Sequence, residues 1–536
     1  MRCSPPPYYL VSGFFLSGLA TLLIVATVSG ISQSFFDPDE SAHYVNSLFL
    51  GDWVRSGFPS PLTFAREFYA NFPKLSIGHW PPGWYSLLTP IFAVVRPSPF
   101  AALALSAFVA GLPGGLILWA LARAGFWRVG IFAAAAYVVL PLVLVSARHF
   151  LLDQPAALAV GLAAIAWVRA TERPRWPRFL LFAALAAFAP LVKGNGALVA
   201  LVPVFDIAIG RRWALLKHPA LWGSALLAIA IVGPWYWLSF QISAGGFNYA
   251  PGPEYAALSF ASNLRAILDN VGWVGVLLAI AGAGSAWIAR RERPEAARIA
   301  AIAVAVPIAT LIFQAAIPVA IEPRYVAPLL PWVVVLAALA LVSLWQRGTP
   351  LARAGTVALA LASLLPAATS APRQPPAADI DAAALIARIQ AHPGIWLVDG
   401  RSGGEGSVIA AAAYADGGSR RVWVARASQW LSTSDFMGRD YRVTAATPAA
   451  AGAVLDRLGV AGAVSIADRG QLAYPHSATL RHALNTPAYT REVVPFRRGA
   501  GSSLVATRLA PVTPAIDLLN SGSGSTNVKK MGVALD

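Results

Sequence analysis

The sequence predicts a polytopic α-helical membrane protein with about eleven transmembrane helices, followed by a soluble α/β domain. Hydrophobic residues make up 57% of the 536 positions and charged residues only 12%, and the mean hydropathy is +0.60. A water-soluble globule of this length would not tolerate such a composition on its surface. Apolar runs of membrane-crossing length recur up to about residue 371 and then shorten to strand length.

The first apolar run, residues 8–31, is too long for the apolar part of a signal peptide, and no cleavage pattern follows it, so we expect it to remain as a span. Pro190, Lys193 and Gly194 interrupt the run 178–209, which we therefore divide near 191–194 into two crossings. The remaining expected spans are 98–122, 129–146, 151–169, 219–241, 268–289, 299–320, 325–345 and 353–371.

Lys and Arg residues concentrate in alternate connections between these spans, as the positive-inside rule requires. If the N-terminus is cytoplasmic, the first long loop, residues 32–97, lies outside, and an odd number of spans places everything after residue 371 outside too. Short amphipathic pieces within that loop, at 41–54 and 83–95, should lie at the membrane interface.

The formal charge of +16 comes largely from the basic inner connections. No basic stretch interleaved with exposed aromatic residues occurs in a soluble part, so we exclude nucleic-acid binding. Cys3 is the single cysteine, which excludes an internal disulfide framework and any cysteine-built metal site.

A linker containing Pro372, Pro375 and Pro376 separates the membrane domain, residues 1–371, from a predicted α/β domain, residues 372–510. The expected strands are 395–398, 421–424 and 463–466, and the expected helices are 380–392, 405–416 and 448–459. Residues 511–536 are rich in Ser, Gly and Asn, and we expect a disordered tail there.

The Gly-rich segment 399–406 should follow a strand and open a helix, where a phosphate-binding loop would lie. Its glycine spacing is not that of a dinucleotide-binding loop, and we favour a simple Gly-rich turn.

Acidic residues gather directly after the first span, at Asp37, Asp39 and Glu40, with His43 one helical turn further on. A loop that only joins two spans has no use for so many ionisable groups at the interface. Asp39 or Glu40 could share a proton, a hydroxyl group or a cation with His43. This set suits a general base and a hard metal equally well, and Mg²⁺, Mn²⁺ or Zn²⁺ would fit.

Further polar positions should reach the same outer face. Lys193 and Arg324 stand at the ends of spans, where a cation must reach water or meet an anion. Asp153 opens a span just before Pro155 and suits a helix cap or a sugar ligand. Glu254 belongs to a Gly/Pro/aromatic loop, 245–255, that could close over a substrate.

The order of these motifs resembles the GT-C glycosyltransferases that use polyprenyl-phosphate sugars, in the branch of protein O-mannosyltransferases, aminoarabinose lipid A transferases and rhizobial core galacturonosyltransferases. The resemblance covers about residues 8–346. Its carriers are Asp39, Glu40, His43 and Tyr44; His79, Pro81, Pro82 and Tyr85; Arg148, Asp153 and Pro155; Lys193 and Gly194; and Arg324, Tyr325, Pro328 and Pro331. One departure is Trp80, which separates His79 from the two prolines.

The resemblance implies a GT-C-like fold in a bacterial inner membrane, with the active site and C-terminal domain on the extracytoplasmic side. It implies inverting transfer of a sugar from a polyprenyl-phosphate donor to a lipid, glycan or protein acceptor. Asp39 or Glu40 would be the base, and a metal, if used, would sit on Asp39, Glu40 and His43. The implied substrate-binding residues are Asp37, His43, Tyr44, His79, Tyr85, Asp153, Lys193, Glu254, Arg324 and Tyr325.

A transporter or flippase of a lipid-linked substrate is the main alternative, because polar residues at membrane depth also mark transport pathways. The charges here collect at one face, and the sequence shows no repeated halves with matching broken segments. Both features favour one-sided catalysis.

Overall fold

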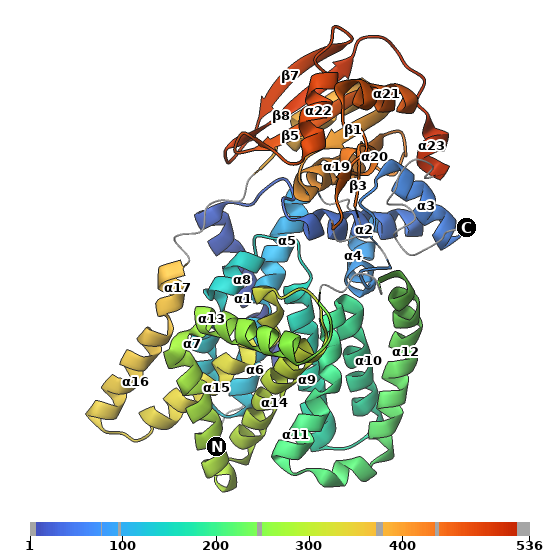
Figure 1. The fold of residues 1–536 in the computed structure, drawn as a ribbon. Coiled ribbons are helices and arrows are strands. Elements are labelled where there is room, and N and C mark those ends of the chain that lie inside the picture. The colour runs from blue at the N-terminus through green and yellow to red at the C-terminus, as the bar shows by residue number, and fades with distance from the viewer. Residues whose placement is uncertain are drawn as a thin grey trace.

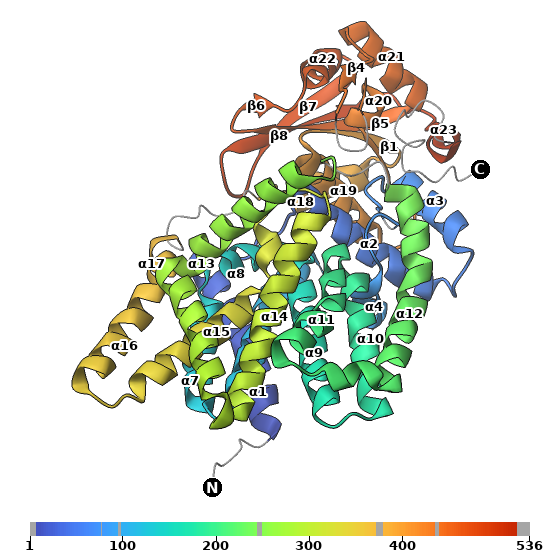
Figure 2. The ribbon, with the colours of Figure 1, turned by 60° about the horizontal axis from the view of Figure 1, so that its bottom comes forward.

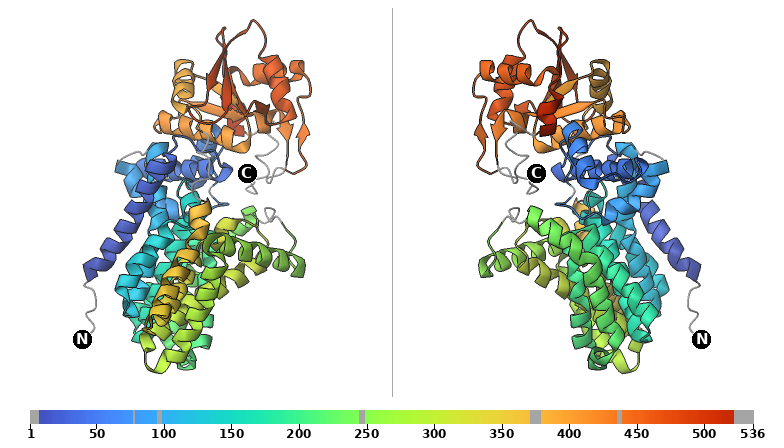
Figure 3. Two further views of the ribbon diagram at one scale, coloured as in Figure 1. Left: turned by 90° about the vertical axis from the view of Figure 1, so that its left-hand side faces the viewer. Right: turned by 90° about the vertical axis from the view of Figure 1, so that its right-hand side faces the viewer.

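The computed structural model describes residues 7–76, 78–94, 98–243, 249–370, 379–434 and 439–521. A long helical region carries an α/β domain at one end, with the blue segment that follows the first helix between them (Figure 1). Helix α1 runs along one side of the helical region toward this domain (Figure 3).

The helices up to residue 210 alternate with short connections. They are α1 (Pro7–Ile24, continued by a π-turn at Val25–Ser29), α2 (Pro38–Arg55), α3 (Pro61–Asn71), α4 (Gly83–Val94), α5 (Pro99–Gly111), α6 (Pro113–Arg123), α7 (Trp127–Val138), α8 (Pro141–Ser146), α9 (Asp153–Glu172), α10 (Trp176–Val192), the 3-10 helix η2 (Gly194–Ala200) and α11 (Val202–Gly210).

Longer helices follow in the second half of the membrane region, and Figure 2 shows α12, α13 and α14 running along the bundle. They are η3 (Trp213–Lys217), α12 (Pro219–Ser243), α13 (Pro253–Ile288), η5 (Ala289–Arg291), α14 (Pro294–Ala316), η6 (Pro323–Val326), α15 (Leu330–Trp345), α16 (Pro350–Ser363) and α17 (Leu365–Ser370).

Within the described ranges, five helical segments are long and apolar enough to cross a membrane by themselves: Val11–Ser29, Pro99–Arg123, Pro219–Phe240, Pro253–Arg291 and Pro294–Ala316. Other expected crossings are shorter apolar helices or pairs of helices, so the count of about eleven stays a prediction. The predicted division of 178–209 is confirmed, because α10 ends at Val192 and η2 begins at Gly194.

The first long loop is largely helical. Helices α2 and α4 correspond to the two expected interfacial pieces, whereas α3 was not expected. The loop buries an aromatic cluster in which Phe49, Phe64, Phe68 and Phe72 contact one another edge to face or stacked. This cluster is continuous with the hydrophobic core of the membrane helices.

The C-terminal domain has a mixed sheet in the order β2-β1-β5-β8-β7, with β6 paired to β5. Strand β1 is parallel to β2 and β5, whereas β8 is antiparallel to both β5 and β7. The elements are α18 (Ala382–Ala391), β1 (Ile395–Asp399), α19 (Ser402–Asp416), β2 (Trp423–Arg426), α20 (Ala427–Trp430), β3 (Ser432–Thr433), β4 (Arg442–Val443), α21 (Pro448–Leu458), β5 (Val460–Asp468), β6 (Gln471–Leu472), α22 (Pro475–Ala483), β7 (Tyr489–Pro495), β8 (Gly501–Arg508) and α23 (Ile516–Ser521).

Two expectations for this domain need correction. The strand expected at 421–424 lies two residues later. Strands β7 and β8 were not predicted, because neither carries a continuous buried apolar run. The start of the predicted disordered tail is folded: Ala515 N donates to Leu458 O at 3.0 Å, and α23 packs on α3. Residues 522–536 of that tail lie outside the described part of the chain.

Glycines allow α19 to lie directly on the start of α2. A Cβ at Gly403 would be 1.8 Å from the carbonyl oxygen of Phe36, and one at Gly406 would be 2.1 Å from Ser41 Oγ. The Gly-rich segment 399–406 therefore serves as a packing surface between the two regions. The segment follows β1 and opens α19, as expected, and only Gly400 and Arg401 lie between the two elements.

The end of the linker is bound to the first loop as well. Asp379, only 2% exposed, accepts hydrogen bonds from Ser32 Oγ at 3.0 Å, Gln33 N at 3.1 Å and Ser34 Oγ at 2.9 Å. The C-terminal domain thus sits on the same side of the bundle as the long loop, held to it at several points.

Candidate functional site

The acidic segment forms the first turn of α2. Asp37 is the N-cap, and its side chain accepts from the backbone N–H of Asp39 at 2.8 Å. Pro38 occupies the first helical position, and Glu40 completes a capping box by accepting from Asp37 N at 2.8 Å. The sequence Asp-Pro-Asp-Glu therefore fixes where the helix starts and which way each carboxylate points.

Glu40 is buried, with 2% of the residue exposed. Its carboxylate also accepts from Phe36 N at 3.1 Å and Phe150 N at 2.9 Å, and His149 Nδ1 lies 3.2 Å from it. Burial opposes a charge on His149, but Glu40 outweighs it and raises the pKa of this imidazole. The Glu40 carboxylate thus links the start of α2 to the connection between α8 and α9, and these contacts occupy its two oxygens.

Asp39 points the other way, into a chain of alternating charges. Its Oδ2 accepts from Arg324 Nη2 at 2.9 Å, Arg324 Nε lies 3.7 Å from Asp153 Oδ2, and Lys193 Nζ donates to Asp153 Oδ1 at 2.6 Å. The Asp39 side chain is 31% exposed, whereas Asp153 is 1% exposed and Lys193 8%. We call these four residues the charge chain.

The members come from four separate elements: Asp39 from α2, Asp153 from the first residue of α9, Lys193 from the C-cap of α10, and Arg324 from η6. The ring of Tyr325 adds a cation–π contact, with Lys193 Nζ 4.8 Å from its centre. Five of the predicted site residues therefore meet in one place.

The electrostatics of the charge chain favour an ionised Asp39. Burial opposes its charge, yet neighbouring cations outweigh burial and hold the pKa of Asp39 below its usual value. Burial, reinforced by the nearby cations Lys193 and Arg324, lowers the pKa of His43 to about 3 against the opposing effect of Asp39, so that ring is neutral at neutral pH. The cations that act on Asp39 there are Arg324 and Lys193. Burial also opposes the charge of Arg324, but Asp153 and Asp39 raise its pKa.

An aromatic wall lies beside Asp39. His43 Nδ1 is 2.7 Å from the hydroxyl of Tyr85, and the His43 ring packs edge to face on Trp80, whose other contact is His79. His43 is 1% exposed and Tyr85 is fully buried. The two residues hold each other in place, and Trp80 and His79 are the half-buried members nearer to solvent.

Other predicted site residues lie elsewhere. Tyr44 is fully buried in the core, with its ring against Phe35 and Phe150. Glu254 is exposed in the first turn of α13, and within the described residues no ion pair joins it to the charge chain. The first part of its loop, 244–248, lies outside the described residues.

The three predicted metal ligands do not converge. Asp39 faces Arg324, Glu40 accepts backbone N–H groups, and His43 faces Tyr85. Within the described part of the chain no group of three or more His, Cys, Asp or Glu side chains is placed to hold a metal ion.

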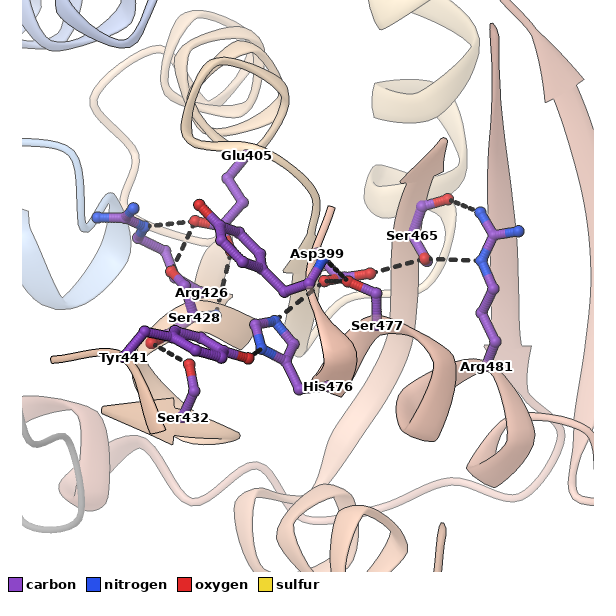
Figure 4. Close-up of polar contacts among 11 residues, drawn as sticks. Asp399, Glu405, Arg426, Ser428, Ser432, Tyr441, Ser465, His476, Ser477 and Arg481 are labelled. Carbon is purple, nitrogen blue, oxygen red and sulfur yellow. Dashed lines mark hydrogen bonds and ion pairs between the residues drawn. The ribbon is translucent and has the colours of Figure 1, made fainter. Parts of the chain in front are cut away.

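A second polar cluster lies in the C-terminal domain at the ends of β1 and β2 (Figure 4). Asp399, fully buried, accepts from Ser465 Oγ at 2.7 Å and Ser477 Oγ at 2.8 Å, with His476 Nε2 at 3.2 Å. The other ring nitrogen of His476 is 2.7 Å from the hydroxyl of Tyr441.

Beside this cluster, Glu405 joins α19 to the end of β2. It accepts from Arg426 Nε at 2.8 Å and from the backbone N–H and hydroxyl of Ser428 at 3.1 and 2.8 Å. The sequence analysis did not identify Arg426, His149 or Lys74. The partners of His149 and Lys74 lie on distant segments, at Glu40 and Ser402, whereas Arg426 pairs with Glu405 of the preceding helix. The Gly-rich segment was the one signal of close packing there.

Comparison with known proteins supports this description of the fold. Residues 80–237 match the family model described as dolichyl-phosphate-mannose-protein mannosyltransferase. A search of curated protein sequences gave no match.

Two solved structures resemble the whole chain. One is ArnT from Cupriavidus metallidurans bound to undecaprenyl phosphate, with 16% identity, a TM-score of 0.55 and coverage of 95% of this chain and 100% of that one. Another is the Archaeoglobus fulgidus oligosaccharyltransferase tethered to an acceptor peptide, with 13% identity, a TM-score of 0.52 and coverage of 96% and 77%.

These findings support the predicted fold: a polytopic helical membrane protein with a strand-containing C-terminal domain, similar in structure to ArnT and to the oligosaccharyltransferase. The family model adds that part of the membrane domain matches enzymes named for a lipid-phosphate sugar donor.

Proposed function

We propose that the protein transfers a sugar, with inversion, from a polyprenyl-phosphate donor to a hydroxyl group of a lipid, glycan or protein acceptor. The reaction would take place at the outer face of a bacterial inner membrane. The observation that carries the proposal is the charge chain, in which a partly exposed carboxylate lies next to two cations.

The charge chain supplies the groups that this transfer needs. Asp39 accepts the proton of the acceptor hydroxyl as its oxygen bonds to the anomeric carbon. The bond from that carbon to the phosphate oxygen breaks, and its electron pair leaves with the lipid phosphate. Arg324 and Lys193 stabilise the charge that gathers on this leaving group. The phosphate departs as an anion and needs no proton, so one base suffices.

Asp39 is a better candidate for the base than Glu40. Asp39 is ionised and reaches solvent, whereas Glu40 is buried and bonded to three backbone N–H groups. A base must come within hydrogen-bond reach of the proton it removes. Glu40 and Asp37 instead set the position of Asp39 as parts of the helix cap.

Asp153 is a positioning residue in this scheme. Its carboxylate forms ion pairs with both Lys193 and Arg324 and keeps both cations near Asp39. Since ArnT of C. metallidurans was solved with undecaprenyl phosphate, a donor phosphate held by these cations is the natural substrate of the arrangement. The half-buried side chains of Tyr325, His79 and Trp80 would contact the sugar.

Transfer from radiolabelled polyprenyl-phosphate sugars tests the proposal, in membranes containing the wild type, Asp39→Asn or Glu40→Gln. We expect Asp39→Asn to lose about 10²–10⁴-fold in rate, the usual contribution of a general base, at normal expression. Glu40→Gln should instead lower the amount of folded protein. A parallel assay with a chelator tests for a metal bound at Asp39, Glu40 or His43.

Normal transfer by Asp39→Asn would show that Asp39 is not the general base. If the lipid-linked sugar moves between the two leaflets of a vesicle membrane and the sugar is not transferred, the protein is a flippase.

A further inference from the structure

Lys74 lies where the first long loop meets the C-terminal domain. It follows α3, and its Nζ donates to Ser402 Oγ of α19 at 3.1 Å. Its Cε lies 3.1 Å from the position of a Cβ at Gly406, so its side chain runs between α2 and α19. In the described part of the chain no carboxylate forms an ion pair with it, and Ser402 uses only one of its three N–H donors.

A second cation faces the same region. Arg426, at the end of β2, donates to Glu405 through Nε, and its two terminal amino groups have no hydrogen-bond partner among the residues that the structure describes. Figure 4 shows its guanidinium on the side of the blue N-terminal segment, where the charge of Arg426 acts on Tyr69 of α3. The side chain is 19% exposed.

The carboxylates near these two cations leave Lys74 without an ion pair among the described residues. Glu405 is already engaged by Arg426 and Ser428, and Asp37 and Asp39 act on Lys74 from further away. Burial and then Arg426 lower the pKa of Lys74 to about 7, against the opposing effects of Glu405, Asp39 and Asp37. An anion entering beside Lys74 would relieve the repulsion between the two cations and use their free donors.

We propose that Lys74 and Arg426 form an anion-binding subsite for the acceptor, which receives a phosphate or carboxylate group carried by that substrate. The subsite is separate from the cations Lys193 and Arg324 assigned to the donor phosphate. Lys74 feels the charge of both Glu405 and Asp39, so it lies between the C-terminal domain and the base. An acceptor anchored there would have its hydroxyl directed to Asp39. This assignment rests on the proposed function.

Binding of radiolabelled inorganic phosphate to the full-length protein tests the subsite. The protein is kept in a phosphate-free maltoside detergent and saturated with undecaprenyl phosphate, which fills the donor site. We expect the wild type to bind phosphate under these conditions. Lys74→Met and Arg426→Gln should each weaken it at least about tenfold, equivalent to about 1.4 kcal/mol, and Lys74→Arg should largely restore it.

Arg491→Gln is the matched control, since Arg491 is an exposed cation on β7 of the same domain, and it should bind phosphate like the wild type. Competition with succinate distinguishes the two sources: displacement indicates a carboxylate-bearing acceptor, and resistance indicates a phosphorylated one. Equal binding by Lys74→Met, or no binding by the wild type, would overturn the subsite. Failure to bind undecaprenyl phosphate would instead count against the proposed donor.

Discussion

Two clusters of ionisable side chains lie on either side of the contact between α2 and α19. In the charge chain, Asp39 is 31% exposed and shares Arg324 with the buried Asp153. In the C-terminal domain, Asp399 is fully enclosed and receives two hydroxyl groups and the imidazole of His476. Both clusters are rich in polar contacts, but only the first leaves an ionised group within reach of a substrate.

The difference shows that polar density alone does not identify an active site. A buried carboxylate whose acceptor positions are filled contributes to a unique fold. A carboxylate that is held ionised by cations and still reaches solvent is ready to exchange a proton or an ion. Four experiments test and sharpen this comparison, beginning with the largest expected effect.

The largest difference is expected between Asp153→Asn, in the charge chain, and Asp399→Asn, in the C-terminal domain. Loss of the Asp153 carboxylate leaves Lys193 and Arg324 without their shared anion, and breaking such a buried pair costs about 3–5 kcal/mol. We expect transfer per folded molecule to fall more than about 100-fold. Asp399→Asn should lower thermal stability but keep transfer per folded molecule within about threefold. Equal losses of transfer in both variants would remove the distinction.

Gly403→Ala tests whether the two regions depend on their contact. The added methyl group would meet the carbonyl of Phe36, and overpacking of this kind costs about 1–3 kcal/mol or more. Thermal unfolding in detergent should occur at lower temperature. Gly452→Ala, in α21 where a Cβ meets nothing within 4 Å, is the matched control and should be neutral or slightly stabilising. A Gly403→Ala protein as stable as wild type would mean that α19 does not sit on α2.

Arg324→Gln should change the pH dependence of transfer. Burial raises the pKa of Asp39 and the cations lower it, so removing one cation raises that pKa. The acid limb of the kcat/KM profile should therefore move to higher pH, apart from any loss in rate. Arg491→Gln should leave the limb in place. An unmoved limb in Arg324→Gln would show that another group titrates.

Tyr85→Phe should have the smallest effect. It removes the hydroxyl group that contacts His43, and a lost hydrogen bond of this kind costs about 1 kcal/mol. We expect a modest drop in thermal stability and a change in transfer of less than about tenfold. Thr89→Val, which removes a bond to the Tyr85 carbonyl on the same helix, is a control for general loosening of α4. A loss as large as that of Asp153→Asn would place Tyr85 in the chemistry itself.

Much of the fold was predictable, because hydropathy marks membrane helices and periodicity marks α/β elements. Lys193 ended a helix as its flanking Pro and Gly indicated, and three of the five strands of the main sheet path were predicted with ends within three residues of those observed. Strand β7 was missed because most of its side chains are exposed at the edge of the sheet, and β8 was missed because its buried positions are few and mixed with partly exposed ones. Helix α3 was not predicted, because it is a short helix within the first long loop.

The site was predictable as a set of residue types but not as a geometry. Nothing in the order Asp39-Glu40 shows that one carboxylate faces two distant cations while its neighbour receives the backbone of Phe36 and Phe150. That choice follows from the capping box and from packing against α8 and α9. Tyr44 and His43 are one residue apart in the motif, but the helix directs one into the core and the other to the site.

The close approach of Gly403 to Phe36 also bears on how the protein is made. The turn that carries Asp39 is among the first segments to leave the ribosome, and the helix that covers it is made hundreds of residues later. Domains generally form in the order of synthesis, so the first loop is made well before the domain that packs on it. The nascent protein would thus remain inactive until its last domain has arrived.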